Sequence, residues 1–332
     1  GNAMLRFKNI ICVATPDCEH GSALKRAVTL AENNQASLTV VDAIEEIPTE
    51  SHYLDPETFL KIKAEIIENH RKQLEELVAP WKNKLNIQVK VLVGIPFIEI
   101  IREVIRNEHD LVIKATGKSG FFDRVFGSDD MHLLRKCPCP VWLDNSKSTD
   151  AYKQILAAVD LDDNFSKEEL KTRHALSLET LTLACSLALS ESAQLNILHV
   201  WKVKGEQAIR VGFVDMADEK ISTIADQVIN QCEKSLKSLM DEVIEKLGTN
   251  TFDYLDPQYN FIKGSPGKEI PKFANKIDAD LVIMGTVSRT GIPGFIMGNT
   301  AESVYGNLNC SVLALKPEGF VSPVTVEEKR SA

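Results

Sequence analysis

Three segments in the second half of the chain carry residue types that could together bind a phosphorylated ligand. Asp160 follows one apolar run, Gly285 follows another, and Gly298-Asn299-Thr300 precedes a helical segment. A carboxylate accepts hydrogen bonds from a sugar hydroxyl or a base amino group. Glycine lets the backbone approach a ligand closely, and the free N–H groups of a helix N-terminus suit a phosphate. The combination predicts a nucleotide-type site.

Each feature taken alone also has an ordinary structural interpretation. Asp160 could cap the helix that follows it, and Asn299 and Thr300 are residues that commonly cap helices. His199, at the end of a predicted strand, is more typical of a structural histidine than of a catalytic one. The prediction of a site therefore depends on whether the fold brings the three segments together.

Both halves of the chain alternate short apolar runs with long helical patterns, which predicts parallel strands covered by helices on both faces. The predicted strands are Asn9–Ala14, Ser37–Asp42, Ile87–Val93, Leu111–Ala115 and Val141–Leu143, then Gln154–Asp160, Leu195–Trp201, Tyr259–Lys263, Leu281–Gly285 and Val312–Leu315. The longest predicted helix of the first half is Pro56–Leu85, whose apolar stripe should face a core. Ligands of such sheets bind beyond the carboxyl ends of the strands, at the switch point.

The two halves are copies of one domain. Gly94–Gly117 aligns with Gly264–Val287 without a gap, and after a slip of one residue Cys139 aligns with Cys310. The spacing between the two copies is far longer than a solenoid unit, so each copy is expected to be a whole domain. We expect domains at residues 4–146 and 151–317, joined by a short polar linker, and a surface tail at residues 318–332.

The second half resembles a universal stress protein domain. ATP-binding members of that family carry Gly-x-x-Gly, nine residues, then Gly-Ser/Thr, and this chain has Gly285-Thr286-Val287-Ser288, nine residues, then Gly298-Asn299-Thr300. The first half, with Gly127-Ser128 followed by residues 132–142, resembles the tandem E-type members, and the likeness covers nearly the whole chain.

The resemblance implies two tandem flavodoxin-like (HUP-type) domains, each a five-stranded parallel sheet, paired across a pseudo-two-fold axis within one chain. It also implies a cytoplasmic stress-response role and ATP, with Mg²⁺, as the ligand. The expected nucleotide contacts are Asp160, Val200, Met284, Gly285, Ser288, Gly298, Asn299 and Thr300.

Departures from the family pattern make the two copies unequal. Ser288 stands in the place of the second glycine, and a positive φ there would cost on the order of 1–2 kcal/mol. Asn299 replaces the usual serine or threonine. In the first half Thr15 occupies the place of Asp160, and the loop after Ala115 is one residue shorter. We therefore expect the first site to be empty or weak.

Composition and failed motifs exclude several other functions. The net charge of −9, with both signs interleaved, argues against general nucleic-acid binding, and no apolar run is long enough to span a membrane. Cys137-Pro138-Cys139 lacks the spacing of redox or zinc motifs. Gly117-Lys118-Ser119 lacks the first glycine of a phosphate-binding loop, because Val112 occupies that position.

These observations predict a non-catalytic stress-response protein whose second domain binds an adenine nucleotide. Two alternatives stay open: a scaffold without nucleotide, and a protein that binds an apolar ligand in the same pocket. A slow ATPase is the most plausible enzyme. The apolar loops at residues 121–126 and 291–296 suit packing better than a lid. Val141–Leu143 and Val312–Leu315 should be edge strands that pair with each other, and a further homodimer of the whole chain stays open.

Overall fold

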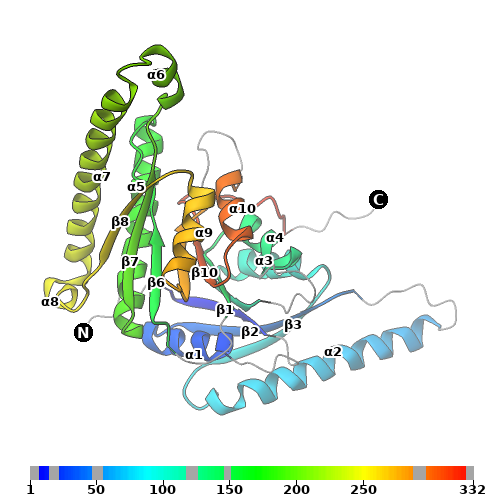
Figure 1. The fold of residues 1–332 in the computed structure, drawn as a ribbon. Helices are drawn as coiled ribbons and strands as arrows, with labels where there is room; N and C mark the ends of the chain where they lie inside the picture. Colours follow the sequence, from blue (N-terminus) through cyan, green and yellow to red (C-terminus); the bar gives the residue numbers. More distant parts are fainter. Residues whose placement is uncertain are drawn as a thin grey trace. The chain divides into compact units, whose positions relative to one another are not determined.

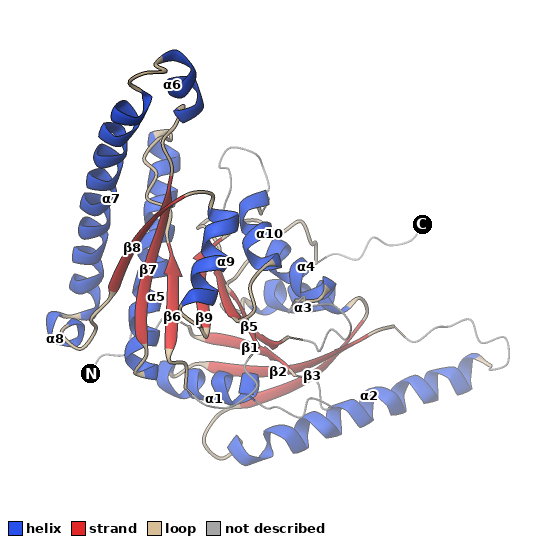
Figure 2. Cartoon of the chain, viewed as in Figure 1, coloured by secondary structure: helices blue, strands red, loops and turns tan. Residues whose placement is uncertain are grey.

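The computed structural model describes residues 7–14, 22–46, 55–116, 126–145, 151–286 and 297–326. Close contacts divide the chain into two compact units. One contains residues 3–150 together with 311–314 and 320–332, and the other contains residues 151–310 and 315–319. Each unit alternates strands and helices along the chain (Figures 1 and 2). The predicted α/β class with tandem domains is confirmed.

In the first repeat, four neighbouring strand pairs are parallel and give the order β3-β2-β1-β4-β5. Its elements are β1 (Asn9–Val13), α1 (Ser22–Asn34), β2 (Ser37–Ile44), α2 (Pro56–Val78), the 3₁₀ turn η1 (Ala79–Trp81), β3 (Ile87–Val93), α3 (Pro96–Asn107), β4 (Leu111–Ala115), α4 (Ser128–Lys136) and β5 (Val141–Asp144). Consecutive residues of β1 are buried, so both faces of the sheet are covered.

In the second repeat, the strands β8, β7, β6 and β9 are also parallel neighbours in that order. Its elements are β6 (Gln154–Ala158), α5 (Lys167–Glu191), β7 (Gln194–Trp201), α6 (Glu206–Gly212), α7 (Ala217–Leu247), α8 (Thr249–Phe252), β8 (Gln258–Lys263), α9 (Pro266–Lys276), β9 (Leu281–Gly285), α10 (Asn299–Gly306) and β10 (Ser311–Leu315). The short helices α6 and α8 were not predicted. Because β6 lies between β7 and β9, the order in which successive strands are added to the sheet reverses beside β6, which makes this the switch point.

The predicted pairing of the two last strands is confirmed. Residues Val312–Ala314 of β10 pair antiparallel with Val141–Leu143 of β5, and both segments belong to the same compact unit. Three hydrogen bonds also hold the described part of the C-terminal tail in that unit. Arg102 Nε donates to the Thr325 carbonyl at 3.0 Å, Arg106 Nη2 to the Val326 carbonyl at 3.3 Å, and Ser322 Oγ to the Lys136 carbonyl at 2.6 Å.

The repeated Gly-x-Pro-x-x-Glu motif has a structural cause that is the same in both copies. Gly94 has φ +148° and Gly264 has φ +150°, a backbone region that favours glycine. A Cβ at either position would lie 2.8 Å or 2.7 Å from the Cγ of the glutamate at the end of the motif, Glu99 or Glu269. The proline then begins α3 or α9, as its fixed φ favours.

The sequence prediction for α2 was partly wrong. The helix ends at Val78 rather than at Leu85, because Pro80 lacks the N–H that would continue it. Only Leu74 and Val78 of α2 are buried, while Ile62 of the predicted core stripe is 37% exposed. The helix that precedes α2, α1, has 13 described residues, whereas its counterpart α5 has 25 and packs against α7.

Candidate functional site

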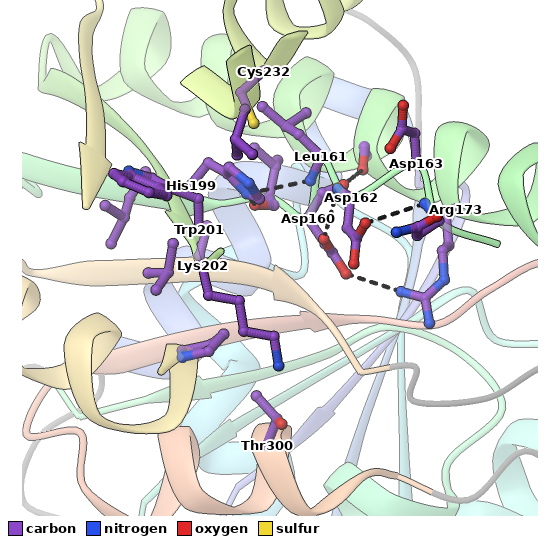
Figure 3. A pocket seen from close by; sticks show the side chains of 18 of the residues that line it. Asp160, Leu161, Asp162, Asp163, Arg173, His199, Trp201, Lys202, Cys232 and Thr300 are labelled. Carbon is purple, nitrogen blue, oxygen red and sulfur yellow. Dashed lines mark hydrogen bonds and ion pairs between the residues drawn. The ribbon is translucent and has the colours of Figure 1, made fainter. Parts of the chain in front are cut away.

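A cavity of about 610 Å³ lies beyond the carboxyl ends of the strands in the second domain. Its walls come from the segment after β6, the ends of β7 and β9, and the helices α5, α7, α9 and α10. Five of the predicted contact residues line it: Asp160, Val200, Met284, Gly285 and Thr300. Figure 3 shows Asp160 and Thr300 on opposite sides of this space. The fold therefore brings together segments that are 140 positions apart in the sequence, from residue 160 to residue 300.

Asp160 lies two residues beyond the end of β6 and is held by two hydrogen bonds (Figure 3). Its Oδ1 accepts from the Asp162 N–H at 3.0 Å, and its Oδ2 accepts from Arg173 Nη1 at 3.0 Å. Its side chain is still 52% exposed. Asp160 does not cap α5, because Ser166 is the N-cap and its Oγ accepts from the Glu169 N–H at 3.3 Å. The carboxylate is thus oriented and open to the cavity.

Charged side chains of both signs line the mouth of the cavity. The Arg173 guanidinium lies 3.8 Å from the centroid of the Phe165 ring, a cation–π contact that fixes it beside Asp160. Lys204 Nζ lies 3.3 Å from Asp162 Oδ2, and Lys202 also lines the cavity. These cations could neutralise the phosphates of a ligand. Sequence reasoning missed Arg173, Lys202 and Lys204, because they belong to no motif.

His199 has the structural role that the sequence favoured. Its side chain is buried, and Nδ1 lies 3.0 Å from the Val159 carbonyl oxygen and 3.2 Å from the Leu161 N–H. The ring therefore ties the end of β7 to the backbone that leaves β6. Burial lowers the pKa of His199, so the neutral ring is favoured at pH 7.

Gly285 is needed for packing as well as for access to the cavity. A Cβ at this position would lie 2.4 Å from Leu176 Cδ2 of α5. The predicted reason for this glycine was the approach of a ligand. The structure adds a second reason, because α5 packs directly over the end of β9.

The N-terminus of α10 is arranged differently from the prediction. Gly298 is the N-cap with an extended backbone, and no side chain caps the helix. Thr300 lines the cavity, whereas Asn299 lines a separate groove between α9 and α10, and Gly298 lines neither. Among the described residues, α10 therefore presents its second residue to the cavity, and the predicted nucleotide contacts of Gly298 and Asn299 stay predictions. Ser288 lies outside the described residues.

The corresponding place in the first domain holds an ion pair. At the offset of the repeat, Lys114 corresponds to Met284 and Asp130 to Ala301, both of which line the cavity of the second domain. Lys114 Nζ lies 2.8 Å from Asp130 Oδ1, and the two side chains are 19% and 3% exposed. Thr15, Gly117 and Lys118 lie outside the described residues.

A second buried polar group lies close to the same end of the first domain. Asp144 Oδ2 accepts from Ser22 Oγ at 2.8 Å and lies 3.8 Å from Arg26 Nε, while Asp144 Oδ1 accepts from Ser311 Oγ at 3.1 Å. Burial, together with the nearby Asp144 carboxylate, raises the pKa of the Cys12 thiol to about 12. Cys12 is therefore a buried thiol and not a nucleophile at neutral pH.

Metal and redox sites need particular groupings of side chains. The described part of the chain holds no group of three or more histidine, cysteine, aspartate or glutamate side chains placed to bind a metal ion. Cys137 and Cys139 are buried thiols that form no disulfide, and their Sγ atoms lie 3.7 Å apart. None of the described helices is long and apolar enough to cross a membrane.

The order of the parallel strands and the cavity at their switch point are typical of a nucleotide-binding-type α/β domain. The sequence profile of the universal stress protein family matches residues 6–144 and 151–316. The chain therefore belongs to the universal stress protein family, with two tandem domains, as the sequence resemblance predicted.

Individual relatives are similar over the full length. Universal stress protein E of Escherichia coli strain K12 is 28% identical over 333 residues, which cover 98% of this chain and 99% of that protein. The universal stress protein E homolog of Haemophilus influenzae is 28% identical over 331 residues, 94% of this chain and 98% of that one. Among solved structures, a putative universal stress protein of Pseudomonas aeruginosa superposes with a TM-score of 0.67 at 24% identity, covering 95% of both chains.

Proposed function

We propose that this protein is a non-catalytic stress-response protein whose second domain binds an adenine nucleotide in the cavity at Asp160. The observation that carries the proposal is the convergence of Asp160, Val200, Met284, Gly285 and Thr300 on one cavity of about 610 Å³. A cavity of this size suits a ligand the size of a nucleotide. The family resemblance supports a cytoplasmic role.

The residues of the cavity fit the parts of such a ligand. Asp160 has lone pairs left to accept hydrogen bonds from a ribose hydroxyl or a base amino group. Val200 and Met284 offer apolar surface for a base. Thr300, near the start of α10, together with Lys202 and Arg173, would hold the phosphates. Mg²⁺ would accompany the phosphates, since it is commonly bound through them.

Calorimetric titration of the full chain with ATP and Mg²⁺ tests this proposal. We expect saturable binding that Asp160→Asn weakens about tenfold, because a charge-assisted acceptor is lost. Thr300→Val should weaken binding less. The matched control is Asp129→Asn, since Asp129 occupies the place of Thr300 in the first domain, and it should leave binding unchanged. Absence of heat at millimolar ATP, or equal affinity in Asp160→Asn, contradicts the proposal.

A ligand with an apolar part is a second candidate, favoured by one observation. The cavity continues along α7, where Ile224, Val228 and Cys232 line it. Mass spectrometry of acid and organic extracts from freshly purified protein separates the two candidates. A nucleotide in the acid extract supports the first, and an apolar compound in the organic extract, lost in Val228→Asp, supports the second.

The same cavity provides little for hydrolysis of a nucleotide. His199, which lines it, has its Nδ1 within hydrogen-bonding distance of two backbone groups. We expect phosphate release from ATP to stay at the rate of a buffer blank. Release that scales with protein concentration and disappears in Thr300→Trp would instead support a slow ATPase.

A further inference from the structure

A second cavity, of about 300 Å³, lies at the opposite end of the strands in the first domain. Strand starts and the C-terminal end of α3 surround it, on the sheet face that α3 covers. The cavity is lined by polar side chains, among them Ser37, Thr39, Asn86, Gln88, Lys90 and His109. This cavity shares no residue with the nucleotide-type site, which lies at the carboxyl ends of the strands in the other domain.

The floor of this cavity is buried and polar. Thr39 is 6% exposed, and the side chain of His109 is 2% exposed. His109 Nδ1 has no hydrogen bond within the described part of the chain, whereas Nε2 faces Glu103 Oε1 at 3.8 Å. Buried polar groups in folded proteins are usually hydrogen-bonded, so an imidazole of this kind calls for an explanation.

Lys90 adds a positive charge at the wall. Its Nζ lies 2.7 Å from Glu103 Oε1, and Asn107 Nδ2 donates to the same oxygen at 2.9 Å. Contacts with His109 and Lys90 hold the pKa of Glu103 at about 2, so this carboxylate is ionised at neutral pH. Lys90 lines the cavity, whereas Glu103 does not. The Lys90 ammonium has three N–H donors, so it can bind Glu103 and still donate to a ligand in the cavity.

The second domain provides an internal control for this arrangement. At the offset of the repeat, Glu103 corresponds to Phe273, His109 to Ala279 and Lys90 to Asn260. Phe273 is buried there, so the second copy folds with an apolar group in place of the carboxylate. The polar floor is therefore not a requirement of the fold.

Two polar side chains at the start of β7 in the second domain are hydrogen-bonded within the protein, whereas those at the start of β2 in the first domain are not, among the residues that the structure describes. In the second domain, Asn196 Nδ2 donates to Gln154 Oε1 at 3.0 Å, and Gln194 Nε2 donates to the Leu195 carbonyl at 3.0 Å. Asn196 and Gln194 correspond to Thr39 and Ser37. Within the described residues, no hydrogen bond joins the side chain of Ser37, Thr39 or Gln88 to another protein group. Their donors and acceptors face the cavity unused.

We propose that this cavity in the first domain binds a small oxyanion, a carboxylate or a phosphate, through Lys90, His109 and the hydroxyls of Thr39 and Ser37. All four groups can donate hydrogen bonds, and an oxyanion accepts several at once. The bound anion also supplies the partner that the buried Nδ1 of His109 lacks, while Nε2 keeps its contact with Glu103.

Histidine-ring ¹H–¹⁵N spectra of the full chain, titrated separately with inorganic phosphate and with acetate, test this proposal. We expect a saturable shift of the His109 signals, which His109→Gln identifies by removing them. Saturation by phosphate alone assigns a phosphate-type ligand, and saturation by acetate alone assigns a carboxylate. No saturable shift with either anion overturns the proposal.

Variants of the two copies make the test specific. Lys90→Met should weaken binding about tenfold, because a charged donor is lost. Asn260→Met, the matched change in the second domain, should have no effect. Thr39→Val keeps the side-chain shape and should weaken binding even if Lys90→Met fails to fold. The shift should persist in Thr300→Val, which separates this site from the nucleotide cavity, and equal affinity in both Lys90→Met and Thr39→Val overturns the assignment.

Discussion

The two domains of this chain share one frame and differ in what fills the end of the sheet. In the second domain, Met284 and Ala301 line an open cavity. In the first domain, the corresponding positions hold the ion pair between Lys114 and Asp130. A duplicated domain can therefore keep every strand and still replace its site, because strand pairing depends on the backbone whereas the cavity depends on a few side chains.

The largest effect is expected from breaking this ion pair. Lys114→Met leaves Asp130 buried without its cation and should lower the free energy of unfolding by about 3–5 kcal/mol. The double variant Lys114→Met/Asp130→Ala installs the residues of the second domain and should recover much of that loss. Urea unfolding measures both. If the double variant were as unstable as the single one, the ion pair would not be a simple replacement for the apolar wall.

The next effect concerns stability in acid, and it comes from Glu103 of the first domain, where the second domain has Phe273. Contacts with His109 and Lys90 lower the pKa of Glu103 from 4.5 to about 2. Because the pKa is lower in the folded state, the contribution is full above about pH 4.5 and is lost as the pH falls toward 2. The contribution is roughly 3 kcal/mol.

The pH dependence of unfolding by urea measures this contribution. Glu103→Gln should unfold with a shallower dependence on pH between about 4.5 and 2, although it is less stable at neutral pH. A change of slope outside this window, or identical slopes in both proteins, would show that another carboxyl group is responsible.

A smaller effect on stability is expected at Gly285, whose counterpart in the first domain, Ala115, carries one more methyl group. Gly285→Ala places a Cβ 2.4 Å from Leu176 Cδ2 and should lower stability by about 1–3 kcal/mol. Ala115, the corresponding residue of the first domain, should tolerate Ala115→Gly at a cost of about 1 kcal/mol or less. Adding Leu176→Ala to Gly285→Ala should relieve the clash without a further loss of stability. Thermal unfolding measures the stability of each variant. If the two substitutions lowered stability additively, the clash would be absent.

The smallest effect on stability is expected at the mouth of the cavity. Asp160 is 52% exposed, so Arg173→Met should change the free energy of unfolding by less than about 1 kcal/mol. The same variant should weaken ATP binding a few-fold, because Arg173 orients Asp160 and, in the proposed binding mode, also contacts the phosphates. Calorimetry and urea unfolding together distinguish the two effects. A large loss of stability with unchanged affinity would make Arg173 a structural residue only.

Several features of the fold and site could be predicted because they depend on local sequence. The positions of the strands along the chain follow from apolar runs, and the Gly-x-Pro-x-x-Glu motif marks the same backbone turn at Gly94 and Gly264. Asp160, Gly285 and Thr300 were predicted to converge, because the carboxyl ends of parallel strands meet at one edge. That Asn299 lines a separate groove could not be predicted, since the direction in which a short helix presents its first residues depends on how it packs.

The sequence by itself determined the duplication, the α/β class, the switch point and the loss of the aspartate at Thr15. Periodicity and repeated motifs encode these properties locally. Only the tertiary structure decided that Arg173 holds Asp160, that Leu176 requires Gly285, and that Lys114 and Asp130 pair in the first domain. Each of those contacts joins residues from different elements, and no local pattern specifies which side chains will meet across a packed interface.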